Sequence, residues 1–191
     1  MDSNLGSLAA DYALRLATPD DAAAMLALYA PYISDTTITL EYEVPTTAEF
    51  AERIRKLQGV LPWLVAVRNG QLLGYAYASR HRERLAYQWS VETSVYVHAE
   101  HHGTGVARRL YNRLFELLQQ QGYVNAYAGV IEPNPRSFAF HQSFGFELIG
   151  TYQHVACKFG KWQTSQWLAK QLLTPPGAPV PPTPLADLQL P

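Results

Sequence analysis

The sequence predicts a mixed α/β (α+β) domain, and three observations support this fold class. The chain has 191 residues, of which 48% are apolar and 16% charged, so it can build a packed core. Segments that alternate like strands are interspersed with segments that have helical spacing. Near the middle, a strand, a glycine loop, an amphipathic helix and another strand follow one another over residues 87–131. Such a unit forms a right-handed crossover if its strands are parallel.

The individual elements are expected in the order β-α-α-β-β-β-α-β-α-β-β. Asn69-Gly70 is a strong hairpin signal between two apolar segments. Pro19 is typical of a first helical turn, and Gly122 is typical of a helix end. The expected strands are 13–17, 63–67, 72–79, 87–97, 123–131 and two more between 145 and 170, and the expected helices are 19–31, 47–58, 106–121 and 137–143.

The two ends of the chain are expected to lie outside one domain. Residues 174–191 hold seven of the 13 prolines, a composition that prevents helix and central strand and is typical of an extended, solvated tail. We therefore expect an N-terminal extension at 1–11, one folded domain at 12–173 and a proline-rich tail at 174–191.

Charge and cysteine content exclude several classes of protein. A formal net charge of −1 argues against a dedicated nucleic-acid binder. The chain lacks a long uncharged apolar run, so no membrane association is expected. Cys157 is the only cysteine, which excludes an intrachain disulfide. Met1-Asp2-Ser3-Asn4 carries no positive charge ahead of an apolar segment, so a secretory signal is not expected. We expect a cytoplasmic protein.

The glycine loop at 103–105 has the composition of a phosphate site. A helix N-terminus presents unpaired N–H groups and partial positive charge, and glycines let a ligand approach the backbone. Arg108 and Arg109 add cations. Val106 stands where a P-loop needs lysine, and Arg108 stands where a dinucleotide fingerprint needs a small residue. The loop alone leaves both phosphate binding and a plain strand-to-helix turn open.

Four further motifs accompany this loop. They are Ser90-Val91-Glu92-Thr93-Ser94-Val95-Tyr96-Val97, the pattern His102-x-x-Gly105-x-Ala107, Asn134, and Phe144-Gly145-Phe146. Together with Pro62–Ala66, Tyr75–Ala78 and the segment around Trp162, they resemble the GNAT acetyltransferase superfamily and, more narrowly, the phosphinothricin N-acetyltransferase family. The resemblance covers about 14–168. It implies a GNAT-type mixed, mostly antiparallel sheet flanked by helices.

The resemblance also implies acetyl-CoA as co-substrate, with its pyrophosphate held by the loop. His102 departs from the family's Gln or Arg at that position, and we expect it to modulate affinity because loop amides do most of the binding. No metal site is expected, since His101 and His102 are adjacent and lack acidic or cysteine partners nearby. The implied cofactor-binding residues are Val95, Tyr96, Val97, His102, Gly103, Thr104, Gly105, Val106, Ala107, Arg108, Asn134 and Ser137.

Two side chains are candidates for proton transfer. Strand alternation places Glu92 and Tyr96 on one surface, and the resemblance makes Glu92 the general base, directly or through water. The alternative for Glu92 is an ion pair with Arg82 or Arg84. His141 occupies the position of a family general acid, and the alternative is a helix-face histidine that bonds a local carbonyl. The resemblance assigns the oxyanion contact to the amide of Val95.

The acceptor pocket is less determined by the sequence. Arginines suit bidentate capture of a carboxylate or phosphinate. Leu40 and Glu41 stand where the family usually has Phe and often Arg, so methionine sulfoximine and methionine sulfone are as plausible as phosphinothricin. The expected substrate-binding residues are Leu40, Arg82, Arg84 and Thr93.

The resulting hypothesis is an acetyl-CoA-dependent N-acetyltransferase that acts on the amine of a small amino-acid-like compound by direct transfer. Cys157 is expected to be a buried thiol, so no covalent acyl-enzyme is expected. The alternatives are a peptide N-terminal acetyltransferase and a non-catalytic CoA-binding module. We expect a homodimer, because aromatic residues are frequent late in the chain and such residues favour interfaces. The resemblance also implies a dimer, since the family is typically dimeric.

Overall fold

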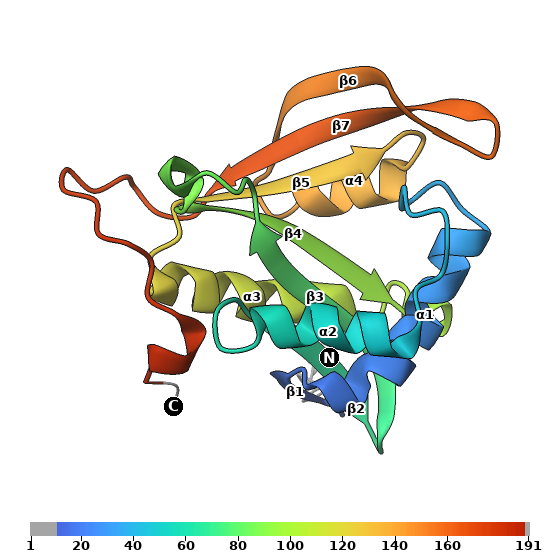
Figure 1. The fold of residues 1–191 in the computed structure, drawn as a ribbon, viewed down its shortest axis with the longest axis horizontal. Coiled ribbons are helices and arrows are strands. Elements are labelled where there is room, and N and C mark those ends of the chain that lie inside the picture. Colours follow the sequence, from blue (N-terminus) through green and yellow to red (C-terminus); the bar gives the residue numbers. More distant parts are fainter. Residues whose placement is uncertain (1–10, 190–191) are drawn as a thin grey trace, which may run out of the picture.

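The computed structural model describes residues 11–189, which form one open sheet with helices on both faces (Figure 1). Residues 1–10 of the expected N-terminal extension lie outside this range. The strands are β1 (Ala13–Leu16), β2 (Trp63–Arg68), β3 (Gln71–Arg80), β4 (Ser90–Val97), β5 (Asn125–Ile131), β6 (Glu147–Lys158) and β7 (Lys161–Gln171). The α-helices are α1 (Ala22–Ser34), α2 (Thr47–Leu57), α3 (Val106–Gln121) and α4 (Pro135–Gln142).

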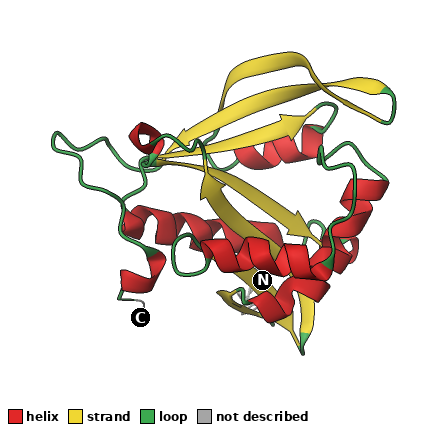
Figure 2. Cartoon of the chain, in the orientation of Figure 1, coloured by secondary structure: helices red, strands yellow, loops and turns green. Residues whose placement is uncertain are grey.

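The expected mixed, mostly antiparallel sheet is confirmed. Its strand order is β1-β2-β3-β4-β5-β7-β6, and β4–β5 is its parallel pair. The long β6–β7 hairpin extends beyond the helices, as Figure 2 shows. The parallel pair is short, because the ladder runs only from Ser90–Asn125 to Glu92–Tyr127. Beyond it the two strands diverge (Figure 1).

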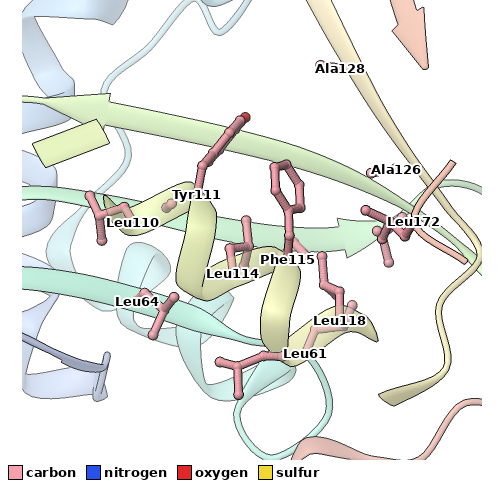
Figure 3. Packing of buried hydrophobic residues seen from close by; sticks show 14 of the residues in the cluster. Leu61, Leu64, Leu110, Tyr111, Leu114, Phe115, Leu118, Ala126, Ala128 and Leu172 are labelled. Atoms are coloured by element: carbon pink, nitrogen blue, oxygen red, sulfur yellow. The ribbon is translucent and has the colours of Figure 1, made fainter. Parts of the chain in front are cut away.

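Helices cover the two faces of the sheet with separate apolar clusters. Leu110, Leu114 and Leu118 lie on one stripe of α3 and pack against β2, β3 and β5, together with Tyr111 and Phe115 (Figure 3). On the opposite face, α1 and α2 bury a second cluster that includes Met25, Phe50 and Tyr75. The spacing of apolar residues in the sequence therefore predicts correctly which face of these helices packs against the sheet.

Several boundaries differ from the predicted ones for local reasons. The strand expected from 87 begins at Ser90, because Leu85–Tyr87 form a 3-10 turn in which the Tyr87 N–H donates to the Arg84 carbonyl. Pro19–Asp21 also form a 3-10 turn before α1. Asn134 caps α4 by accepting from the Ser137 N–H at 3.1 Å, so that helix starts earlier than expected.

The proline-rich segment is mostly exposed but lies against the domain, which corrects the expectation of a free, extended tail. The Trp89 indole N–H donates to the Val180 carbonyl at 2.7 Å. The Gln121 side-chain amide donates to the carbonyls of Val60 and Thr183 at 2.7 and 2.9 Å. Leu185, which is 4% exposed, enters the core beside the end of α3. The tail is therefore held by buried polar and apolar contacts. Within residues 11–189, no helix is long and apolar enough to cross a bilayer.

Replacing Leu185 with alanine should lower the free energy of unfolding by about 2–3 kcal/mol, because the deletion leaves a cavity in the core. Urea denaturation followed by tryptophan fluorescence measures the change. Val180→Ala is the matched control. The Val180 side chain is 73% exposed and its bonded carbonyl is retained, so a change within about 0.5 kcal/mol is expected. Equal stability of the Leu185 variant and wild type would mean that the tail does not contribute to the core.

Candidate active site

The divergence of β4 from β5 opens one edge of β4. The His98 N–H donates to the Leu73 carbonyl of β3, so alternation along the strand directs the N–H of Val95 away from β3. The Trp89 carbonyl accepts from the Val124 N–H on the same outer side. Since the β4–β5 ladder stops at Glu92, the Val95 amide faces the gap between the diverging strands. An outward amide at such a gap is a ready hydrogen-bond donor.

A continuous groove runs from this gap to the start of α3. It consists of two adjoining hollows that share Val97, His102, Ala107, Arg136 and Phe140. All the predicted cofactor-binding residues line one or both hollows except Thr104. Residues that the sequence analysis did not select also line it: Tyr32, Ile38, His101, Arg136, Ala139, Phe140 and Ser143. The fold therefore brings the glycine loop, the β4 edge and α4 to one surface.

Gly103 and Gly105 give this groove an accessible backbone. Their φ angles are +77° and +88°, a left-handed region that favours glycine. A Cβ added at either position would meet nothing within 4 Å, so the glycines face open space. Gly105 is the N-cap of α3 and offers no capping side chain, which leaves the first amides of the helix available to a ligand. This arrangement suits an anion.

Two guanidinium groups flank the loop. Arg108 donates to the Ser143 hydroxyl at 2.9 Å and lies over the Phe144 ring. Arg136, at the start of α4, donates to Nδ1 of His102 at 2.7 Å. Neither forms an ion pair among residues 11–189, so their charge is available to the groove. These cations, together with the loop amides, fit a diphosphate.

His102 is a structural link within this surface. Its Nε2 lies 3.0 Å from the Val97 carbonyl, and its Nδ1 faces a guanidinium that can only donate. The ring therefore carries its proton on Nε2 and accepts at Nδ1. Burial, and then the neighbouring Arg136, lower the pKa of His102. Here a neutral imidazole orients a cation beside the glycine loop.

Glu92 is the last paired residue of β4 before the gap, and its side chain lies on the same sheet face as that of Tyr96. Its Oε1 is 3.0 Å from Nδ1 of His81 and 3.3 Å from Nη1 of Arg82. The carboxylate is about one-third exposed (32%), so it is reachable from solvent. The expected ion pair with Arg82 is thus present, and His81 is a second partner that the sequence analysis did not select. Both the paired and the reactive interpretation of Glu92 agree with this geometry.

His141 lies on the α3 side of the sheet and is 5% exposed. Its Nδ1 is 2.8 Å from the Ser137 carbonyl, so this nitrogen carries the proton, and Nε2 lies 3.1 Å from the Tyr111 hydroxyl. Tyr111 in turn lies 3.5 Å from the Thr93 hydroxyl. Burial lowers the pKa of His141, and the Ser137 hydrogen bond partly opposes this. The expected local carbonyl bond is therefore present, and Thr93 faces this buried chain.

The segment 35–46, which contains Leu40, bridges the two halves of the molecule. Glu41 forms a bidentate ion pair with Arg53 of α2 at 2.7 and 3.0 Å. The buried Lys158 of β6 donates to the Thr39 carbonyl at 2.7 Å. Burial lowers the pKa of Lys158. Leu40 is thus held between α2 and the β6–β7 hairpin, and Glu41 is used for support within the protein.

Arg84 and Cys157 lie apart from Glu92. Arg84 lines a separate hollow under the tail, with Tyr123 and Pro182. Arg82 reaches both that hollow and Glu92. Cys157 is half-buried, so the expected burial of this thiol is only partial. Residues 11–189 contain no group of three or more His, Cys, Asp or Glu side chains that could hold a metal ion.

The missed residues had only weak signals in the sequence. Arg136 follows Pro135 directly, and a cation in the first turn of a helix near a phosphate loop could have been selected. His81 sits in a charged turn where a solvated side chain is the usual outcome. Its contact with Glu92 depends on the β3–β4 register, which pairs Ser79 with Glu92.

Comparison with known proteins gives consistent results. The profile of the Acetyltransferase (GNAT) domain matches residues 14–167. The phosphinothricin N-acetyltransferase of Streptomyces viridochromogenes is 34% identical over 170 residues, covering 88% of this chain and 93% of that protein. The L-methionine sulfoximine/L-methionine sulfone acetyltransferase of Salmonella typhimurium is 36% identical over 118 residues, covering 62% and 68%.

Solved structures agree with these sequence relatives. The phosphinothricin acetyltransferase of Sinorhizobium meliloti, solved in complex with acetyl-CoA, superposes with a TM-score of 0.83. It is 30% identical and the match covers 92% of this chain and 98% of that one. With the divergent β4–β5 pair and the glycine-capped α3 already described, these matches show that the chain belongs to the GNAT acetyltransferases, within the phosphinothricin N-acetyltransferase family, and is an N-acetyltransferase.

Proposed function

We propose that the groove binds acetyl-CoA and that Glu92 serves the transfer of the acetyl group to the amine of a small amino-acid-like acceptor. The observation that carries this proposal is the geometry of β4. Its open edge faces the groove, and its neighbouring face carries a solvent-accessible carboxylate. A thioester bound along that edge lies between an amide donor and a proton acceptor, which are the two groups that aminolysis needs.

The acetyl-CoA pyrophosphate binds at the glycine loop in this proposal. The amides that follow Gly105, with Arg108 and Arg136, supply the positive field. Asn134 uses its side-chain oxygen to cap α4, so its NH₂ group is left to contact the pantetheine arm. Tyr96, Val97 and Ser137 contribute the walls that guide this arm toward Val95.

The transfer step itself is a direct attack. The acceptor ammonium loses a proton to the Glu92 side of the gap, and the amine then attacks the thioester carbonyl carbon. The Val95 amide donates to the oxygen on which charge develops, a contact that is typically worth ~3 kcal/mol in the transition state. The C–S bond breaks as the tetrahedral state collapses, and the thiolate takes the second proton of the amine nitrogen.

His141 is the proposed route for this second proton. When protonated at Nε2 it can donate to Tyr111, whose hydroxyl can pass its own proton to the departing thiolate. Its lowered pKa makes the protonated ring a stronger acid. The ring gains the second proton of the amine nitrogen as it gives a proton to Tyr111, so its protonation state is the same at the start and the end of each cycle.

The acceptor lies on the face of Glu92, against the β6–β7 hairpin. Relatives named as phosphinothricin and methionine sulfoximine or sulfone acetyltransferases support an α-amino acid with a polar tetrahedral side chain as the acceptor. Arg82 is placed for its acidic groups, and Leu40 is a second expected contact. Thr93, which was also expected to bind the acceptor, faces the buried Tyr111 on the other side of the sheet and is not part of the proposed pocket. Arg84, which lines the hollow under the tail, is not part of the proposed pocket.

We also propose a homodimer in the cytoplasm. The β6–β7 hairpin exposes apolar side chains that a partner subunit would cover: Ile149, Val155, Phe159 and Trp162 are 58%, 48%, 55% and 68% exposed. Exposed large apolar side chains on one hairpin favour an interface. A cytoplasmic location agrees with the unpaired thiol of Cys157.

Replacing Glu92 with glutamine should lower kcat at least ~100-fold at pH 7, because proton transfer by a positioned base contributes about that much or more. The assay measures thiol release from acetyl-CoA with phosphinothricin, methionine sulfoximine, methionine sulfone and a panel of N-terminal peptides. Calorimetric affinity for CoA should stay within about threefold of wild type. Turnover of peptides alone would refute the proposed acceptor class, and no CoA binding at millimolar ligand would refute the enzyme.

The unfolding free energy should fall as the pH is lowered below about 6.5, the ordinary histidine value. Because His141 and His102 have lowered pKa values when folded, the unfolded chain takes up protons first. Their contribution is complete above that pH and is lost as the pH falls toward the folded values. His141→Asn should flatten the decline in urea unfolding between pH 7 and 5, whereas the exposed His98→Asn should not. Parallel declines in all three proteins would contradict the assignment.

Light scattering should give twice the mass of one chain at micromolar concentration. Trp162→Glu should shift the population toward monomer, because it places a charge in the apolar hairpin surface. Val180→Glu, on the exposed tail, is the matched control and should leave the mass unchanged. A monomeric wild-type protein would refute the dimer.

A further inference from the structure

His81 occupies a fixed position next to Glu92, at the point where β4 and β5 begin to separate. Its backbone N–H donates to the Ser90 carbonyl at 3.4 Å, which continues the β3–β4 ladder one step beyond the end of β3. Alternation from Ser79, the register partner of Glu92, places the His81 side chain on the same sheet face as Glu92. Its imidazole is thus on the acceptor side of the sheet.

Aromatic rings hold this imidazole in place. The ring stacks on Tyr127 with centroids 4.2 Å apart and planes 17° apart. The edges of Trp167 and Tyr87 approach it at 6.1 and 6.2 Å. The groups around the ring that can carry charge are Glu92, Arg82, Tyr87 and Tyr127. These contacts hold the imidazole in one orientation beside Glu92.

The hydrogen bond to Glu92 fixes the tautomer. A carboxylate only accepts, so Nδ1 of His81 carries the proton in the 3.0 Å contact. In the neutral ring, Nε2 then holds a lone pair. Nε2 has no hydrogen-bond partner among residues 11–189, and it is not one of the fully buried polar atoms that lack a partner. The side chain as a whole is 13% exposed. Nε2 therefore faces a narrow space that solvent or a small ligand can reach.

We propose that His81 is the residue that takes the proton from the acceptor ammonium, with Glu92 as the carboxylate that positions it. This inference rests on the proposed function and specifies how Glu92 acts. The arrangement is that of a carboxylate–imidazole pair, in which the carboxylate orients the ring and stabilises the imidazolium that forms. Imidazole is the side chain most often used as a general base near neutral pH.

The protons balance in this scheme. The ammonium N–H bond breaks and its proton moves to Nε2 of His81, which leaves the amine lone pair free. The C–N bond forms at the thioester carbonyl, and the C–S bond breaks on collapse. The second proton leaves the amide nitrogen and ends on the thiol, while His81 returns the first proton to solvent. Arg82 bonds to the same Glu92 oxygen, which limits the stabilisation of imidazolium and lets that proton go.

The test compares three variants that separate the base from its hydrogen bond. His81→Asn keeps an N–H donor near the position of Nδ1 but has no basic nitrogen, His81→Ala removes both, and His98→Asn is the exposed control. We expect kcat/KM for the acceptor at pH 7 to fall at least ~100-fold in both His81 variants. The KM for acetyl-CoA, the CoA affinity and the circular dichroism spectrum should match wild type.

A pH series distinguishes a lost base from a distorted site. An enzyme without the base depends on acceptor that is already neutral, so kcat/KM of His81→Asn should rise about tenfold per pH unit from 7 to 9 and close most of the gap to wild type. A pH-independent deficit would overturn the proposal, as would His81→Asn activity within threefold of wild type. If one of these two results occurs while wild type is active and Glu92→Gln is inactive, the role of His81 is refuted but the proposed function is retained. If wild type itself is inactive, the proposed function is refuted.

Discussion

The site depends on one constraint, the early end of the parallel β4–β5 pairing. Three register pairs, from Ser90–Asn125 to Glu92–Tyr127, hold the strands together, and beyond them the backbone of β4 has a free edge. Backbone donors without partners are costly when buried, so this edge persists only because it borders an accessible groove. The Val97 carbonyl illustrates the same point, since side chains of Tyr32 and His102 satisfy it in place of a strand. A ligand with a carbonyl oxygen can do the same for the Val95 amide.

The two sides of this edge have different electrostatic characters. On the groove side the charges are cationic and come from Arg108 and Arg136, oriented through a hydroxyl and a neutral imidazole. On the acceptor side Glu92 is the anionic group, bonded to His81 and Arg82. Separation by the sheet keeps the phosphate-binding cations from neutralising the carboxylate. The cation-rich groove and the site that takes a proton from the amine can therefore lie on the two sides of a single strand.

Sequence patterns predicted what depends on local or periodic physics. The stripe on α3 and the glycine turn at its start follow from spacing and residue type. The alternation that put Glu92 on the face of Tyr96 is likewise a property of any strand. What the sequence could not supply was long-range register. His81 meets Glu92 only because Ser79 pairs with it, and Arg136 meets His102 only because α4 returns beside the loop. The tail was mispredicted for the same reason: its prolines exclude regular structure but say nothing about docking.

That docking supports the fixed end of the diverging strands. The Trp89 carbonyl accepts from the N–H groups of Val124 and Asn125, at the first step of the β4–β5 junction. The indole N–H of the same residue donates to the Val180 carbonyl in the tail. The side-chain amide of Gln121, at the end of α3, donates to the carbonyl of Thr183, three residues after Val180. The junction, the end of α3 and the tail are thus tied at one corner. The tail therefore contacts the end of the strand pair at which β4 and β5 are still hydrogen-bonded, three residues before Glu92 along the chain.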